Sequence, residues 1–137
     1  MINKLKKYFE NCDYDFVLLF GSYADGTNSS LSDIDIAVYK KNLDLKDLGY
    51  DNAMLESLLK LKIDTVILNK LEQKNPLLAF NIIKNHQVLF LKSETNYINF
   101  KTRSQLSYLD HKPLLESNMR DLKNRIDTNT FAKRDYA

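Results

Sequence analysis

The stretch that decides the fold reads Phe16-Val17-Leu18-Leu19-Phe20-Gly21-Ser22 and resumes, after ten intervening residues, as Asp33-Ile34-Asp35-Ile36-Ala37-Val38-Tyr39. Five apolar residues that stop at a glycine predict a short strand buried on both faces. The alternation that opens the second segment predicts another strand. The residues between them, 21–32, are rich in Gly, Ser, Thr, Asn and Asp. We therefore expect two strands joined by a loop.

Two carboxylates stand at the start of the second predicted strand. Side chains two residues apart point to the same face of a strand, so Asp33 and Asp35 project together from positions about 6.6–6.8 Å apart, and Ile34 turns into the core. Carboxylate oxygens suit Mg²⁺, which usually keeps some waters and takes substrate phosphates as further ligands. This spacing is suited to a pair of divalent ions that bind a phosphorylated substrate.

Gly21-Ser22 is suited to binding the phosphates themselves. A glycine at the end of a strand lets the backbone approach a triphosphate, and the N–H groups of a following helical turn face the anion. The Ser22 hydroxyl adds a donor, and Gly26 permits the chain to reverse toward Asp33. Asp25 adds negative charge here, which opposes phosphate binding unless its side chain faces solvent or a lysine from elsewhere compensates.

A third carboxylate, Asp64, stands on the next predicted strand, residues 63–68. If that strand neighbours the strand of Asp33 and Asp35, Asp64 can complete the site. It could then bind the metal nearest the nucleophile and assist in removing its proton. Each signal alone is also found in ordinary strands and loops, whereas the combination favours a catalytic site.

The rest of the chain predicts helices between further strands. Apolar residues at helical spacing predict a helix over residues 2–12, with Cys12 in the core, and another over 46–61, with Leu48, Leu55, Leu58 and Leu59 on one face. Asn75 and Pro76 predict a helix start, residues 87–91 a fourth strand, and residues 95–111 a helix. A last helix begins at Pro113, and we expect its stripe, Leu115, Met119, Leu122 and Ile126, to contact a partner. This order predicts an α/β fold, a central sheet with helices packed on it.

Composition narrows the classes of function. The chain has 137 residues, which fits one domain, and a net charge of +2. Acidic and basic residues are equal in number over residues 1–93, which does not favour nucleic acid as the main partner. With no apolar run near 18 residues, no signal-like start and a single cysteine, we expect no membrane segment and a cytoplasmic location. His86 and His111 have no partner at metal-ligand spacing.

Gly21-Ser22, ten residues, then Asp33-Ile34-Asp35 resembles the GS-x10-DxD signature of the DNA polymerase beta-like nucleotidyltransferase superfamily. The resemblance extends over residues 1–92. The short chain further resembles the MNT antitoxins, the minimal nucleotidyltransferases paired with HEPN ribonuclease toxins. It implies a single domain, 1–137, with a mixed sheet of about four strands. Within it, residues 1–92 would form the catalytic core, 93–127 a helical extension and 128–137 a flexible tail.

The resemblance also implies an activity. Members of the MNT antitoxin group transfer AMP from Mg-ATP to a tyrosine of the cognate HEPN toxin and so inactivate it. Asp33 and Asp35 would hold two Mg²⁺ ions with Asp64 assisting the nucleophile, and Gly21 and Ser22 would bind the nucleotide phosphates. Two alternatives stay open: an antitoxin that acts by binding alone, and a small-molecule adenylyltransferase of the aminoglycoside type. The latter usually needs a second domain, for which about 45 residues after the last predicted strand leave little room.

Overall fold

Four strands form one mixed sheet in the computed structural model, which describes residues 1–29 and 32–111. The strands are β1 (Phe16–Phe20), β2 (Ile34–Tyr39), β3 (Ile63–Ile67) and β4 (His86–Leu91), in the order β3-β2-β1-β4. β1 runs antiparallel to β2 and β4, and β2 runs parallel to β3. The α/β class with a mixed four-stranded sheet is confirmed.

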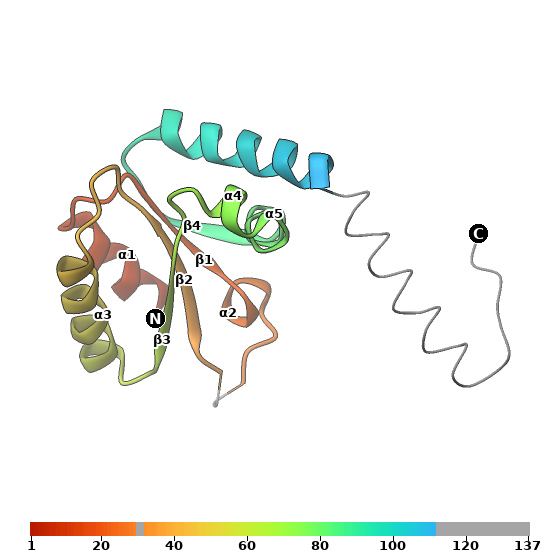
Figure 1. The fold of residues 1–137 in the computed structure, drawn as a ribbon. Helices are drawn as coiled ribbons and strands as arrows, with labels where there is room; N and C mark the ends of the chain where they lie inside the picture. Colours follow the sequence, from red (N-terminus) through yellow and green to blue (C-terminus); the bar gives the residue numbers. More distant parts are fainter. Residues whose placement is uncertain (30–31, 112–137) are drawn as a thin grey trace, which may run out of the picture.

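Helices cover both faces of this sheet (Figure 1). α1 (Ile2–Glu10) and α3 (Leu45–Leu59) lie on one face, where Leu5, Phe9 and Leu55 pack against alternate residues of β1 and β2. α4 (Leu71–Lys74), α5 (Pro76–Lys84) and a helix over residues 94–111 lie on the other. Because both faces are covered, β1 is buried along nearly its whole length, as its unbroken apolar run predicts.

Local sequence explains where the helices begin. The Asp44 side chain accepts a hydrogen bond from the Lys46 amide at 2.9 Å and starts α3. The Asn75 side chain accepts from the Leu78 amide at 3.1 Å, with Pro76 in the first helical position of α5. These are N-cap bonds that satisfy amides left without partners at a helix start. The predicted helix start at Asn75-Pro76 is confirmed.

The helix over residues 94–111 is fastened to α4 and α5. Arg103 Nε donates to Glu72 Oε1 at 3.2 Å, and Ser107 Oγ donates to the Glu72 carbonyl at 2.7 Å. The rings of Phe80 and Tyr108 stack with centroids 3.9 Å apart. In the described ranges, no helix is both long and apolar enough to cross a membrane.

The helical turn expected after Gly21 is present as α2 (Ser22–Asp25), with Gly21 and Gly26 at positive φ at its two ends. Other expectations need correction. Asp33 lies just before β2 rather than in it, and α4 was not expected. Leu58 was predicted to share the buried face of α3 with Leu55 but is half exposed, so it lies at the margin of that face.

Two further expectations concern Cys12 and the end of the chain. Cys12 lies after the end of α1 and is half-buried rather than a core residue. The helix expected from Pro113, with its stripe over 115–126, and the tail 128–137 lie outside the described residues.

Candidate active site

Parallel pairing of β2 with β3 brings two of the predicted carboxylates together. In the register of this pair, Asp35 lies opposite Asp64, and Ile34 lies opposite Ile63. The strand of Asp64 therefore neighbours the strand of Asp35, which is the condition that the expected role of Asp64 requires. Both carboxylates share the sheet face that carries Ala37 and Val66, because these residues are two positions further along each strand. Asp33 precedes β2 at the same end of the sheet.

Gly21 packs directly against one of these carboxylates. A Cβ built on Gly21 would lie 2.2 Å from Asp35 Oδ2, and the Gly21 backbone has φ +75°. Phe20, the preceding residue, is the β1 partner of Asp35. The absence of a side chain therefore allows the turn after β1 to lie in contact with the Asp35 carboxylate. Gly21 and Asp35 thus lie together at the end of the sheet where Asp33 and Asp64 also lie.

The first two amides of the helical turn after Gly21 have no hydrogen-bond partner within that turn. In α2, the amides of Ala24 and Asp25 donate to the Gly21 carbonyl at 3.1 and 3.3 Å. The amides of Ser22 and Tyr23 come before these bonds and are the donors that the start of a helical turn leaves without a partner inside it. Such amides can bind phosphate oxygens, and the partly exposed Ser22 can supply its hydroxyl beside them.

Asp25 lies at the other end of α2. Its exposed carboxylate accepts hydrogen bonds from the Thr27 amide at 3.0 Å and the Thr27 hydroxyl at 2.6 Å. These bonds favour the charged form and hold the pKa of Asp25 below its ordinary value. The carboxylate thus closes the turn at Gly26 instead of facing the amides at the start of α2.

The carboxylates at this end of the sheet repel one another. The pKa of Asp35 is raised, first by burial, then by the charge of Asp64 and then by that of Asp33. Among residues 1–29 and 32–111, the two ion pairs are Lys92–Asp13 and Arg103–Glu72, so no basic side chain pairs with the three aspartates. A bound cation would relieve this repulsion.

The donor set fits magnesium held jointly with a substrate. In the described part of the chain, no group of three or more His, Cys, Asp or Glu side chains is arranged to hold a metal by itself. Mg²⁺ commonly binds through one or two carboxylates and completes its shell with water and substrate phosphates. Asp35 and Asp64, adjacent in register and without basic partners, match that incomplete set, and a triphosphate at Gly21 and Ser22 could supply the rest.

Other residues hold the site in place but were not predicted from the sequence. Gln87 Nε2 on β4 donates to the Ala24 carbonyl at 2.9 Å and fastens α2 to the sheet. Asn52 and Glu56 of α3 bond to β3 around Ile63, the residue before Asp64. Polar residues on α3 and β4 give no sequence signal for these contacts, because the contacts depend on which elements become neighbours.

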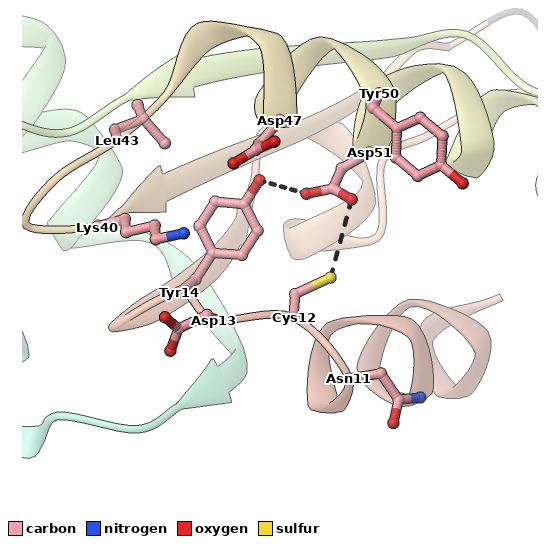
Figure 2. A pocket seen from close by; sticks show the side chains of 9 residues that line it. All are labelled: Asn11, Cys12, Asp13, Tyr14, Lys40, Leu43, Asp47, Tyr50 and Asp51. Atoms are coloured by element: carbon pink, nitrogen blue, oxygen red, sulfur yellow. Dashed lines mark hydrogen bonds between the residues drawn. The ribbon is translucent and has the colours of Figure 1, made fainter.

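A hollow of about 210 Å³ lies at the opposite end of the sheet, where β1 begins and β2 ends (Figure 2). Its floor contains Asp51, which accepts hydrogen bonds from the hydroxyls of Tyr8 and Tyr14, each at 2.7 Å. Burial and the Asp51 charge raise the pKa of both tyrosines, and they raise that of the Cys12 thiol to about 11. A thiol this hard to ionise is a poor nucleophile. We therefore assign this hydrogen-bond network the role of linking α1 to α3.

The two histidines contribute no metal site. His86 Nδ1 lies 3.1 Å from the carbonyls of Ile82 and Ile83, and its Nε2 lies 2.7 Å from the Tyr97 hydroxyl. His111 Nδ1 lies 2.8 Å from the Ser107 carbonyl. Both residues thus bond to the ends of helical turns, and His86 is half-buried.

A mixed four-stranded sheet with a Gly-Ser turn beside paired aspartates is the arrangement of a nucleotidyltransferase fold. The family model described as polymerase beta, nucleotidyltransferase, matches residues 3–95, more than half of the chain. The chain therefore belongs to the polymerase beta nucleotidyltransferase family.

Solved structures of similar fold come from toxin–antitoxin systems. A chain of a toxin–antitoxin structure with AMP-PNP is 24% identical, with a TM-score of 0.67, and the match covers 86% of this chain and 98% of that one. A chain of a tri-AMPylated Shewanella oneidensis HEPN toxin in complex with MNT antitoxin is 22% identical, with a TM-score of 0.61 and coverage of 86% and 95%. A chain of the MntA–HepT toxin–antitoxin is 21% identical, with a TM-score of 0.60 and coverage of 86% and 96%. At these identities the likeness shows the fold. No curated protein matches the chain.

Proposed function

We propose that this chain is an antitoxin that transfers AMP from Mg-ATP to a tyrosine of a cognate HEPN-class toxin and thereby inactivates it. One observation carries the proposal: Asp35 lies opposite Asp64 in the β2–β3 register and in contact with Gly21. The two chemical requirements of nucleotidyl transfer, carboxylates for a metal and a close backbone approach for phosphates, are thus met at one point. The AMP-PNP and tri-AMPylated toxin of the similar structures support the choice of nucleotide and acceptor.

Each residue has a stated role in the proposed reaction. The tyrosine oxygen attacks the α-phosphorus of ATP in line, a new O–P bond forms, and the bond to pyrophosphate breaks. Asp64 accepts the tyrosine proton, while the turn at Gly21 and Ser22 orients the β- and γ-phosphates. Asp33 and Asp35, with Asp64, would hold two Mg²⁺ ions, which neutralise charge on the triphosphate when bound.

The alternatives receive less support. A small-molecule acceptor calls for a concave pocket beside Asp64. Asp64 lines neither the hollow around Asp51 nor the hollow lined by Lys4, Lys7, Tyr8, Asn11 and Leu58. The binding-only antitoxin was suggested by the charge of Asp25, and that carboxylate is bonded to Thr27 at the far end of α2.

The test is to co-express the chain with the protein encoded by the neighbouring gene and to weigh both products by intact mass spectrometry. We expect the partner to gain mass in whole AMP units, and we expect the Asp33→Asn/Asp35→Asn variant to abolish this gain. Asp25→Asn, which neutralises an exposed carboxylate of the same loop, is the matched control and should leave transfer intact. A partner that co-purifies unmodified with the unaltered chain would favour the binding-only antitoxin.

A further inference from the structure

The helical turn α2 has little packing of its own. It consists of four residues, none of which is buried, and the side chains of Tyr23 and Ala24 are only partly buried against the core. The hydrogen bonds from its last two amides to the Gly21 carbonyl close the turn but do not attach it to the sheet. Asp25 bonds to Thr27, which belongs to the same loop. The position of the turn beside the aspartates therefore depends on contacts from other elements.

In the part of the chain that the structure describes, one hydrogen bond joins α2 to another element. Gln87 Nε2 of β4 donates to the Ala24 carbonyl at 2.9 Å. Carbonyls in the last turn of a helix have no partner inside it, so this bond satisfies a group that the short helix leaves free. Gln87 lies opposite Leu19 in the β1–β4 register, and Leu19 is two residues before Gly21. The bond therefore links the strand beside β1 to the loop that follows β1.

The start of β4 is itself held by the helices on the sheet face that carries the aspartates. His86, the residue before Gln87, lies opposite Phe20 in the register. Its Nδ1 lies 3.1 Å from two carbonyls at the end of α5, and its Nε2 lies 2.7 Å from the Tyr97 hydroxyl. Gln87 thus extends from a strand end that α5 and the helix over residues 94–111 both hold. It gives α2 a fixed point of attachment.

The turn that Gln87 attaches lies against a proposed metal ligand. Gly21 begins the turn, and a Cβ on it would lie 2.2 Å from Asp35 Oδ2. Asp35 lies opposite Asp64 in the β2–β3 register. A movement of the turn would therefore shift the groups that bind phosphate relative to the carboxylates that bind metal. A misplacement of about 1 Å can cost on the order of a hundredfold in rate.

The same bond contributes little to the fold. Gln87 is exposed. Water replaces the partners of an exposed hydrogen bond when that bond is lost, so its net contribution to stability is small. Loss of the Gln87 donor should therefore affect the site much more than it affects folding.

We propose that Gln87 is a positioning residue for the nucleotide. Through the Ala24 carbonyl it holds the turn of Gly21 and Ser22 against Asp35, where the β- and γ-phosphates of ATP bind. Gln87 acts through the backbone of α2 and not by touching the nucleotide or the metal. This inference rests on the proposed function for the identity of the ligand, Mg-ATP.

The experiment uses the whole chain and measures the Kd for Mg-ATP without a partner, the rate of AMP transfer to the co-expressed partner, and the melting temperature. Gln87→Met keeps the length of the side chain and removes the donor. We expect it to raise the Kd and to lower the transfer rate, each at least about tenfold, with a melting temperature close to that of the unaltered chain. Gln73→Met, which alters an exposed glutamine of α4, is the matched control and should change none of the three.

A second variant tests whether Gln87 acts through the turn. Ser22→Ala removes a hydroxyl that the turn carries, and we compare its effect on the Kd in the unaltered chain and in Gln87→Met. If the turn is already displaced in Gln87→Met, Ser22→Ala should raise the Kd less there, because residues that act through one structure are not additive. An equal effect in both backgrounds would mean that Gln87 acts by another route, and the inference would be wrong.

The outcomes separate positioning from chemistry. A Kd that depends on Gln87, in a chain that never modifies its partner, supports the positioning role and contradicts AMP transfer. Normal binding and normal transfer by Gln87→Met overturn the positioning role and leave AMP transfer standing. Loss of binding together with a large fall in melting temperature would assign Gln87 to the fold and would also overturn it, as would an unaltered chain that does not bind Mg-ATP.

Discussion

At Gly21 two constraints fall on one backbone position. Its φ of +75° disfavours any side chain, and a Cβ there would collide with the Asp35 carboxylate. Gly26 has a similar φ of +80°, but nothing lies within 4 Å of its Cβ position. The two glycines therefore differ in backbone conformation, with ψ −154° at Gly21 and ψ 10° at Gly26, and in their contact with Asp35.

We expect Gly26→Ala to lower the free energy of unfolding by about 1–2 kcal/mol, the cost of a left-handed conformation for alanine. Gly21→Ala should lower it by more, because φ +75° with ψ −154° is a conformation open essentially to glycine alone and the added Cβ would collide with Asp35. Only Gly21→Ala should also lower AMP transfer, by at least roughly tenfold, because it moves a proposed metal ligand. Denaturation curves and transfer assays on the two variants check this. Equal loss of transfer in both would contradict a specific role for the Gly21–Asp35 contact.

Asp35 allows a test of the electrostatics of the site. Its pKa is raised by burial, then by Asp64, then by Asp33. In protein free of divalent ions we therefore expect Asp64→Asn to lower the pKa of Asp35 more than Asp33→Asn does. A titration of the Asp35 carboxyl carbon by NMR measures both changes. The reverse order would mean that the carboxylates are not arranged as the β2–β3 register places them.

The raised pKa of Asp35 also determines whether this residue stabilises or destabilises the fold at a given pH. A carboxyl whose pKa is raised on folding binds its proton more tightly in the folded state. Its favourable contribution is complete below the unfolded pKa and is lost as the pH rises through the folded pKa. Asp35→Asn should therefore raise the melting temperature at neutral pH, while it abolishes transfer. Such opposite effects on stability and activity are typical of catalytic groups.

At the scale of the elements, α1 and α3 are joined by a small polar network. Asp51 of α3 accepts from Tyr8 of α1 and from Tyr14, which is 3% exposed. Asp51→Ala would leave a buried hydroxyl without its partner, and we expect a loss of about 1–3 kcal/mol in the free energy of unfolding. Asp47→Ala, at an exposed position of the same helix, should cost less than about 1 kcal/mol. Urea unfolding compares the two, and equal losses would show that the network contributes nothing beyond surface charge.

Elements with a strong local pattern were predicted well. β1 and β2 follow from an unbroken apolar run and from alternation, and α5 follows from Asn75-Pro76. The four-residue helix α4 was not predicted, because one turn carries no periodicity that a pattern can detect, and the turn α2 was expected only from Gly21-Ser22. The exposure of Leu58 was missed for a related reason: apolar spacing alone cannot show where the buried face of a helix ends.

The candidate site shows the same limit. The spacing from Gly21 to Asp35 is local, and it was enough to predict that these two residues lie together. The adjacency of Asp35 and Asp64 depends on which strands pair and in which direction. From local pattern it could be stated only as a condition, namely that the strand of Asp64 neighbours the strand of Asp35. The ties from Gln87 and Asn52 depend on the final arrangement of β4 and α3, so no local signal could reveal them.

At the scale of the whole molecule, the site can be tested through its effect on folding. The three aspartates repel one another and have no basic partner among the described residues, so the folded chain gains most from a ligand that brings magnesium and phosphates together. A ligand that binds only the folded state at about a hundred times its Kd raises the free energy of unfolding by about 2.7 kcal/mol. We expect Mg-ATP to give a rise of this order, measured as an increase in melting temperature.

The metal dependence is tested by comparing the increase in melting temperature with Mg-ATP, with ATP and a chelator, and with Mg²⁺ alone. Because the described side chains form no complete metal site by themselves, Mg²⁺ alone should stabilise the chain much less than Mg-ATP. ATP without the metal would add phosphate charge to a site that already repels it, and it should give little or no rise. The Asp33→Asn/Asp35→Asn variant should lose the rise with Mg-ATP, whereas Asp25→Asn should keep it. An equal rise with ATP and chelator would mean that the nucleotide binds without the aspartates, and the metal-dependent mechanism would then be wrong.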